Sequence, residues 1–329
     1  MKRLSIVLAV ILVLPAAASA VTVSPIRPVS TYSIVARDPD TGELGVAVQS
    51  HWFSVGQLVP WAQAGVGAVA TQSMVEPAYG PRGLALMAQG VSAAGALAQL
   101  LEGDPGHQMR QVAMVDAQGG VANFTGSRCI AEAGGRTGEG YAVQANLMAK
   151  GTVPDAMAGA FEAATGPLAE RLLAALAAAE KAGGDIRGRQ SAALLVVAAE
   201  ATDKPWQDVR VDLRVEDHPV PVAELTRLLR LHRGYEEMNA GDLAVEHGDL
   251  AGAGRAYAAA EAILGENLEG RFWHAVALVN GGELERALPL FAAVFARGPN
   301  WRELTLRLVE PGYLLVDEAQ LARIMAQGQ

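Results

Sequence analysis

The sequence lacks the residues on which several common kinds of site are built. Cys129 is the only cysteine among 329 residues, so an intramolecular disulfide and a metal site of several thiolates are both excluded. Acidic residues outnumber basic ones, 35 against 26, and there are no runs of Lys and Arg. Because nucleic acids and anionic membranes attract clustered positive charge, the net charge of −9 disfavours both as partners.

Cofactor motifs and membrane spans are also missing. The six histidines do not show the short paired spacings of metal ligands. Gly135–Gly140 is rich in glycine but matches neither the dinucleotide-binding nor the P-loop pattern, so we interpret it as a loop. We therefore expect no cofactor and no metal. No later stretch reaches about 18 unbroken apolar residues, so we expect the mature chain to be soluble and not to span a membrane.

The chain begins with the features of an export signal. Lys2 and Arg3 precede an apolar run over Leu4–Leu14, and Ala18-Ser19-Ala20 forms a small-residue cleavage site. The apolar run is too short for a membrane anchor, since the hydrocarbon core is about 30 Å thick. We expect a signal peptide over residues 1–20, a short leader over 21–30, and a bacterial protein that is periplasmic or secreted.

Residues 31–232 alternate between blocks of strands and pairs of helices. Asp38–Gly42 is a strong turn signal between two β-prone segments, which predicts a hairpin. Further strands are expected at 53–61, 65–73, 111–116, 120–125, 190–199 and 209–215, a strand or short helix at 141–150, and helices at 80–90, 92–102, 154–164 and 168–182. This order predicts an α+β fold, in which two antiparallel sheets pack face to face with helices outside.

Residues 233–329 are predicted to be entirely helical, with an internal period of 34 residues. His247-Gly248-Asp249-Leu250 recurs as Gly281-Gly282-Glu283-Leu284, followed by matched pairs at the same offset: Ala253 with Ala287, Tyr257 with Phe291, and Ala262 with Ala296. This is the tetratricopeptide (TPR) period. It predicts a TPR-like helical module that presents a concave surface to a protein partner. An unrelated helical hairpin with a chance period is the alternative.

Segments spread over the whole first domain carry a resemblance to a known family: Thr31–Asp38, Gly42–Val48, Gln72-Ser73, Pro77–Gly80, Asn123–Gly126, Gly184–Ser191 and Val211–Val215. In these segments the domain resembles the DUF1028 family of the Ntn-hydrolase superfamily. It implies an αββα sandwich, which agrees with the element order above. It implies no particular substrate.

The superfamily resemblance makes Thr31 a candidate nucleophile. Members of the superfamily are amidohydrolases that use the first residue of a processed chain, whose free α-amine has a pKa low enough to act as a base. Thr31 has the matching position, Ser33 points to the same face of the strand, and Asn146 could donate a hydrogen bond to an oxyanion. This chemistry requires a cut between residues 30 and 31. The lysine used by proteasome-like members has no counterpart here, because no Lys occurs between Lys2 and Lys150.

A second set of residues suggests ligand binding. Asp185, Arg187 and Arg189 precede an apolar strand, where arginine could hold a carboxylate in a bidentate fashion. Other candidate ligand-binding residues are Tyr79 and Arg82, at a predicted helix start, and Arg214 on a strand. Each also has a purely structural interpretation, as a local ion pair or a turn anchor.

Two functions follow. One is an exported Ntn-type amidohydrolase acting on a peptide or amino-acid-derived amide. The other is a non-catalytic periplasmic binding protein for a small anionic ligand or envelope component, with the TPR-like module docking a protein partner.

Overall fold

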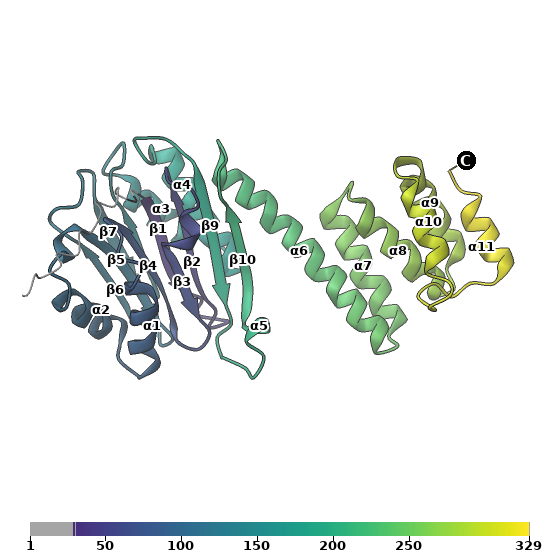
Figure 1. Ribbon diagram of the computed structural model, residues 1–329, viewed down its shortest axis with the longest axis horizontal. Helices are drawn as coiled ribbons and strands as arrows, with labels where there is room; N and C mark the ends of the chain where they lie inside the picture. Colours follow the sequence, from purple (N-terminus) through teal and green to yellow (C-terminus); the bar gives the residue numbers. More distant parts are fainter. Residues whose placement is uncertain (1–28, 30, 329) are drawn as a thin grey trace, which may run out of the picture.

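The computed structural model describes residue 29 and residues 31–328, which form an α+β domain and a helical module (Figure 1). The predicted signal peptide and nearly all of the predicted leader lie outside the described residues. The predicted fold class, a sandwich with layers αββα followed by an all-helical module, is confirmed.

The larger sheet has six antiparallel strands in the order β10-β9-β2-β1-β8-β7. Its strands are β1 (Thr31–Arg37), β2 (Leu44–Ser50), β7 (Gly134–Gly138), β8 (Tyr141–Ala145), β9 (Ser191–Val197) and β10 (Val209–Val215). The predicted hairpin forms with β1 and β2 paired from Thr31 opposite Ser50 to Arg37 opposite Leu44. Asp38 closes the turn by accepting hydrogen bonds from the backbone N–H groups of Asp40 and Thr41.

The smaller sheet has four antiparallel strands in the order β3-β4-β5-β6. They are β3 (Pro60–Gln63), β4 (Gly67–Ser73), β5 (Arg110–Asp116) and β6 (Val121–Thr125). The two sheets pack through a buried layer of small and β-branched side chains, which includes Val35, Val46, Ala70 and Val115. Val29 adds an isolated bridge to Ser73 at the end of β4.

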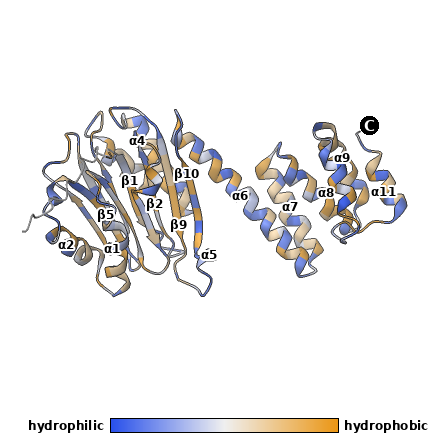
Figure 2. Cartoon of the chain, in the orientation of Figure 1, coloured by the Kyte–Doolittle hydropathy of each residue, from blue (hydrophilic) through white to orange (hydrophobic). Residues whose placement is uncertain are grey.

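Helices cover the outer face of each sheet. Helices α1 (Tyr79–Ala88) and α2 (Ala93–Glu102) pack on the smaller sheet, and α3 (Val153–Ala163) and α4 (Leu168–Ala182) pack on the larger one. Figure 2 shows mainly hydrophobic residues along the central strands and mixed colours on the helices. The helices therefore bury one stripe and leave the other to solvent.

Two local predictions were wrong. The strand expected at 53–61 is instead a 3-10 turn, Val55–Gln57, followed by the short β3. Gly135–Gly140 is not only a loop, because Gly134–Gly138 is the edge strand β7. It has no alternation of apolar residues and is held by its pairing with β8, so its sequence pattern gives no strand signal.

The helical module begins with α6 (Pro221–Glu246). The first half of this helix packs on the α+β domain through Val222, Leu225 and Leu229. The expected boundary at 232–233 falls within this helix. The remaining helices are α7 (Leu250–Leu264), α8 (Leu268–Asn280), α9 (Leu284–Arg297), α10 (Asn300–Arg307) and α11 (Glu318–Met325), and a short α5 (Pro205–Asp208) precedes β10.

The 34-residue period corresponds to two helical hairpins. Helices α7 and α9 begin 34 residues apart, and each follows a glycine with positive φ, Gly248 at 74° and Gly282 at 82°. The repeated aromatics Tyr257 and Phe291 are both buried. The glycine turns and buried aromatics give each hairpin the same packing. None of the described helices is long and apolar enough to cross a membrane.

Candidate functional site

The alternation of β1 sends neighbouring polar side chains to opposite faces of the larger sheet. Thr31 and Ser33 face the smaller sheet, whereas Tyr32, between them, faces α4. All three side chains are fully buried. They therefore belong to two separate polar regions, one on each side of a single strand.

The first region is a buried polar cluster between the two sheets. Its members are Thr31, Ser33, Gln72, Gln111, Gln144 and Asn146, all fully buried. The Ser33 hydroxyl donates to Gln72 Oε1 at 2.7 Å, and Gln72 Nε2 in turn donates to Gln111 Oε1 at 2.7 Å. Asn146 Nδ2 donates to the same Gln111 oxygen at 2.9 Å. The structure thus brings together the three predicted catalytic residues, Thr31, Ser33 and Asn146.

The cluster is almost completely satisfied by its own hydrogen bonds. Gln144 Nε2 donates to Ala70 O at 3.0 Å, and Gln111 Nε2 donates to Ala145 O at 2.9 Å. Asn146 Oδ1 is its one side-chain atom without a partner in the described chain. A network of this kind fixes how the two sheets pack, because each buried amide must keep its partner.

Thr31 is held within this cluster by hydrogen bonds of its side chain. Its hydroxyl donates to Val29 O at 2.8 Å and shares a 3.2 Å hydrogen bond with the Ser50 hydroxyl. Val29 is tied to Ser73 by two backbone hydrogen bonds of 2.7 and 3.0 Å. Until the chain is cut before Thr31, the Thr31 nitrogen is part of a peptide bond and cannot act as a base.

The second region surrounds a cavity of about 360 Å³ on the other face of β1. The cavity lies between the ends of β1 and β2, the end of α4 and the loop that follows α4. It is lined by Tyr32, Gln49, Glu180, Gly183, Gly184, Asp185, Gly188, Arg189 and Pro219. A volume of this size is at the lower end of the range for small-molecule sites.

Gln49, a fully buried side chain in this cavity, has polar atoms without a partner in the described chain. Gln49 is directly opposite Tyr32 in the β1–β2 pairing. Neither amide atom of Gln49 makes a hydrogen bond within the described chain. The Tyr32 hydroxyl interacts with the Glu180 carboxylate, although not with the geometry of a good hydrogen bond. Burying such groups without partners costs about 1–3 kcal/mol each, so this arrangement is unusual in a folded protein.

Glu180 and Arg189 add one charge of each sign to the cavity. Arg189 Nε lies 3.5 Å from Glu180 Oε1, and the Arg189 side chain is 45% exposed whereas that of Glu180 is 17% exposed. Burial raises the pKa of Glu180, partly offset by Arg189. Burial and the nearby Glu180 carboxylate raise the pKa of Tyr32 well above its ordinary value, so this phenol stays protonated.

The loop between α4 and β9 is fixed by Asp185 and shaped by glycines. Asp185 accepts hydrogen bonds from the His51 N–H at 3.2 Å and from Arg187 N and Nη2 at 2.9 and 2.8 Å. Gly184 and Gly188 have φ angles of 59° and 107°, which favour glycine. Two of the residues predicted in this loop, Asp185 and Arg189, line the cavity. The third, Arg187, pairs with Asp185 and lines a neighbouring hollow with His51.

The other predicted ligand-binding residues lie elsewhere. Arg214 pairs with Asp212 at 3.0 Å on the exposed side of β10. Tyr79 is buried in α1 and donates to Asp104 at 3.1 Å, and Arg82 is exposed on the same helix. Burial raises the pKa of the Cys129 thiol, which disfavours a thiolate nucleophile there. The described residues contain no group of three or more His, Cys, Asp or Glu that could hold a metal.

Comparison with known proteins identifies the first domain. The pattern of a family described as "Family of unknown function (DUF1028)" matches residues 31–225. The chain belongs to the DUF1028 family. It is also similar to the crystal structure of protein SPO2555 from Silicibacter pomeroyi, which is assigned to DUF1028. The TM-score is 0.55 and the identity 32%, over 65% of this chain and 92% of that one. No curated protein matches.

Sequence reasoning missed Tyr32, Gln49 and Glu180 of the DUF1028 domain. Gln49 is a polar residue at a buried position near the end of the otherwise apolar strand β2. A polar residue that interrupts an apolar strand pattern is a sequence feature that could have indicated this site. The glutamines of the buried cluster gave the same kind of signal. Only the strand register, which pairs Gln49 with Tyr32, places the cavity residues together.

Proposed function

We propose that the DUF1028 domain binds a small polar molecule in the cavity beside Tyr32 and Gln49. The observation that carries this proposal is Gln49, a fully buried amide whose two polar atoms have no partner in the part of the chain that the structure describes. A bound molecule that supplies one donor and one acceptor would satisfy Gln49 and recover the hydrogen bonds that the chain leaves unmade.

The cavity's chemistry supports a neutral or zwitterionic ligand rather than a simple anion. Arg189 and Glu180 carry opposite charges at the cavity wall, and Tyr32 stays neutral. The Asp185 carboxylate is engaged by Arg187 and by the backbone of His51. An amino acid or a small amide, which has adjacent donors and acceptors, matches these groups. With the predicted export signal, we propose that binding takes place in the periplasm or outside the cell.

A ligand screen on the mature protein tests this function. Amino acids and small amides would be tested for a rise in Tm, followed by calorimetry on those that raise it. A ligand at 100 times its Kd should stabilise the fold by about 2.7 kcal/mol and raise Tm by a few degrees. Gln49→Leu and Arg189→Ala should abolish or weaken this rise. Arg214→Ala is the matched control, since Arg214 is an equally exposed arginine outside the cavity. A ligand that stabilises Gln49→Leu as much as the wild type, or a screen without any hit, would contradict the proposal.

Amide hydrolysis by Thr31 is the second candidate, favoured by its place at the first residue of β1 beside Ser50 and the buried cluster. It requires cleavage before Thr31, which would free the amine, and the released segment would then be held only by contacts such as the Val29–Ser73 bridge. Intact mass and N-terminal sequencing of protein secreted by its native host test this directly. A chain that begins at Thr31 would support hydrolysis, and activity should then be lost in Thr31→Ala. A chain that begins at Val21 would exclude it.

A further inference from the structure

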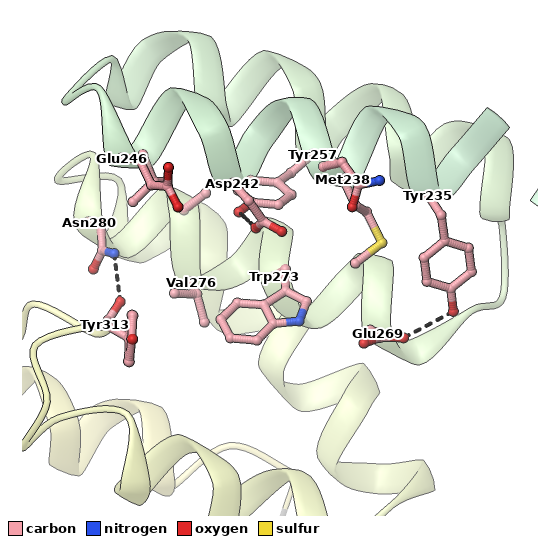
Figure 3. Close-up of a pocket in the computed structure, with 13 residues that line it drawn as sticks. Tyr235, Met238, Asp242, Glu246, Tyr257, Glu269, Trp273, Val276, Asn280 and Tyr313 are labelled. Atoms are coloured by element: carbon pink, nitrogen blue, oxygen red, sulfur yellow. Dashed lines mark hydrogen bonds between the residues drawn. The ribbon is translucent and has the colours of Figure 1, made fainter. Parts of the chain in front are cut away.

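The helical module has a groove that is separate from the DUF1028 domain's cavity. It has a volume of about 450 Å³ and is lined by one stripe of α6, one stripe of α8, Tyr257 of α7, and Tyr313 after α10 (Figure 3). The α6 stripe consists of Tyr235, Met238, Asn239, Asp242, Val245 and Glu246, and the α8 stripe of Glu269, Trp273, Val276, Ala277 and Asn280. Within each stripe the residues recur every three or four positions, so they share one helix face.

The groove's dimensions suit a short extended segment. Each stripe covers eleven residue steps, from 235 to 246 and from 269 to 280, which is about 16 Å along a helix. An extended chain advances about 3.3 Å per residue, so about five residues would fit along the groove.

Hydrogen bonds fix the side chains at both ends of the groove. At one end, the Tyr235 hydroxyl donates to Glu269 Oε2 at 3.0 Å. At the other, Asn280 Nδ2 donates to Tyr313 O at 2.9 Å, and Leu315 N donates to Asn280 Oδ1 at 2.8 Å. The first bond holds the Tyr235 ring in place, and the other two hold Asn280 against the backbone at Tyr313 and Leu315, as Figure 3 shows in part. A preformed surface loses less entropy on binding.

The groove's charge is of one sign. Its lining includes the carboxylates of Asp242, Glu246 and Glu269 and contains no Lys or Arg. From Gly234 onward the chain has fourteen Asp and Glu against seven Arg and no Lys, a net charge of −7 out of −9 for the whole chain. The module's arginines are mostly engaged elsewhere, for example Arg271 with Glu261 and Arg323 with Glu285.

Aromatic faces next to these carboxylates complete the recognition surface. Tyr313 is 64% exposed and Tyr235 is 37% exposed. Trp273 is half-buried and lines the middle of the groove. A cation over a tryptophan or tyrosine ring is attracted to the ring face, and a nearby carboxylate adds to this attraction. The same surface repels an acidic segment.

We infer that this groove binds an extended segment of a partner protein that is rich in Lys or Arg. The Lys or Arg side chains of the partner lie against the ring of Trp273 and pair with Asp242 and Glu246. The aliphatic parts of the same Lys or Arg side chains cover Met238 and Val276. Complementary charge of this kind sets the choice of partner and speeds association.

Three labelled peptides test the inference on the full mature chain. Each is a fluorescein-labelled heptapeptide that alternates alanine with lysine, glutamine or glutamate, and binding is followed by fluorescence anisotropy. We expect the lysine peptide to bind, and its affinity to fall several-fold when NaCl is raised from about 50 to about 500 mM. The glutamine peptide should bind more weakly, and the glutamate peptide should not bind.

Neutral variants of the same shape locate the site. The double variant Asp242→Asn/Glu246→Gln should weaken binding of the lysine peptide by about tenfold. The matched control is Glu236→Gln/Glu237→Gln, which removes two carboxylates from the same helix outside the groove and should change affinity less than about twofold. Trp273→Leu should weaken binding without altering the salt dependence. The inference is overturned if the lysine peptide fails to bind the wild type, if the glutamate peptide binds equally well, or if the two double variants behave alike.

Discussion

The two polar regions on either side of β1 are equally buried but differ in how their hydrogen bonds are satisfied. In the cluster between the sheets, glutamines and hydroxyls bond to one another and to backbone carbonyls. In the cavity beside α4, Gln49 is buried just as deeply, and neither of its amide atoms has a partner among the described residues. Burial of polar groups alone therefore does not distinguish the structural cluster from the cavity that we propose binds a ligand. The presence or absence of partners does.

The largest expected effect comes from breaking the satisfied cluster. Gln72→Leu removes bonds to Ser33, to the Thr31 carbonyl and to Gln111, and it leaves these buried groups unpartnered. The free energy of unfolding should fall by about 3–5 kcal/mol. Urea denaturation followed by circular dichroism measures it. A loss below about 1 kcal/mol would mean that the cluster does not hold the sheets together.

Removing one hydroxyl from the same cluster should have a smaller effect. Ser33→Ala deletes the 2.7 Å bond to Gln72 and the 3.2 Å bond from Gln144, but Gln144 keeps its bond to Ala70 O. We expect a loss of about 1–2 kcal/mol in the free energy of unfolding, from the same denaturation experiment. If Ser33→Ala costs as much as Gln72→Leu, the hydroxyl and not the amide organises the cluster.

The same Gln→Leu change in the cavity should cost almost nothing. Gln49 makes no hydrogen bond that the substitution could break, and leucine is of similar size. Without ligand, Gln49→Leu should leave the free energy of unfolding within about 1 kcal/mol of the wild type or raise it. Gln72→Leu serves as the matched comparison, because both glutamines are fully buried. A large loss in Gln49→Leu would show that Gln49 has a structural partner.

The smallest effect is a pH dependence from Glu180. Its folded pKa is raised above the ordinary value of 4.5 by burial, so its protonated form favours the folded state. The corresponding stability is present below the unfolded pKa and is lost as pH rises through the folded pKa. Glu180→Gln should therefore match the wild type near pH 4 and become relatively more stable above it, as measured by Tm across that range. The opposite trend would mean that Arg189 dominates over burial.

Much of the fold was predictable, because most elements have strong local patterns. The β1–β2 hairpin follows from the turn at Asp38–Gly42, and the two helical hairpins follow from the 34-residue period. β7 was missed because Gly134–Gly138 lacks apolar alternation and is a strand only through its partner β8. Long-range pairing of this kind is not encoded in a local window.

The candidate site was predictable only in part, for a similar reason. Asp185 and Arg189 were named from a polar segment before an apolar strand, and both line the cavity. Tyr32 and Gln49 are 17 positions apart and meet through strand register, while Glu180 reaches them from α4. No spacing rule links three such residues. The unpartnered amide of Gln49 can be recognised only in the three-dimensional structure.

Helix α6 connects the two surfaces that we propose bind ligands. Its 26 residues form one unbroken helix about 39 Å long, with Leu225 in the core of the DUF1028 domain and Glu246 at the groove. Because a helix turns by about 100° per residue, its length sets the direction in which the groove points as well as its distance from the cavity. Inserting one alanine near its middle would leave both surfaces intact but rotate one against the other by more than a quarter turn. The number of residues in α6 therefore sets the relative orientation of the cavity and the groove.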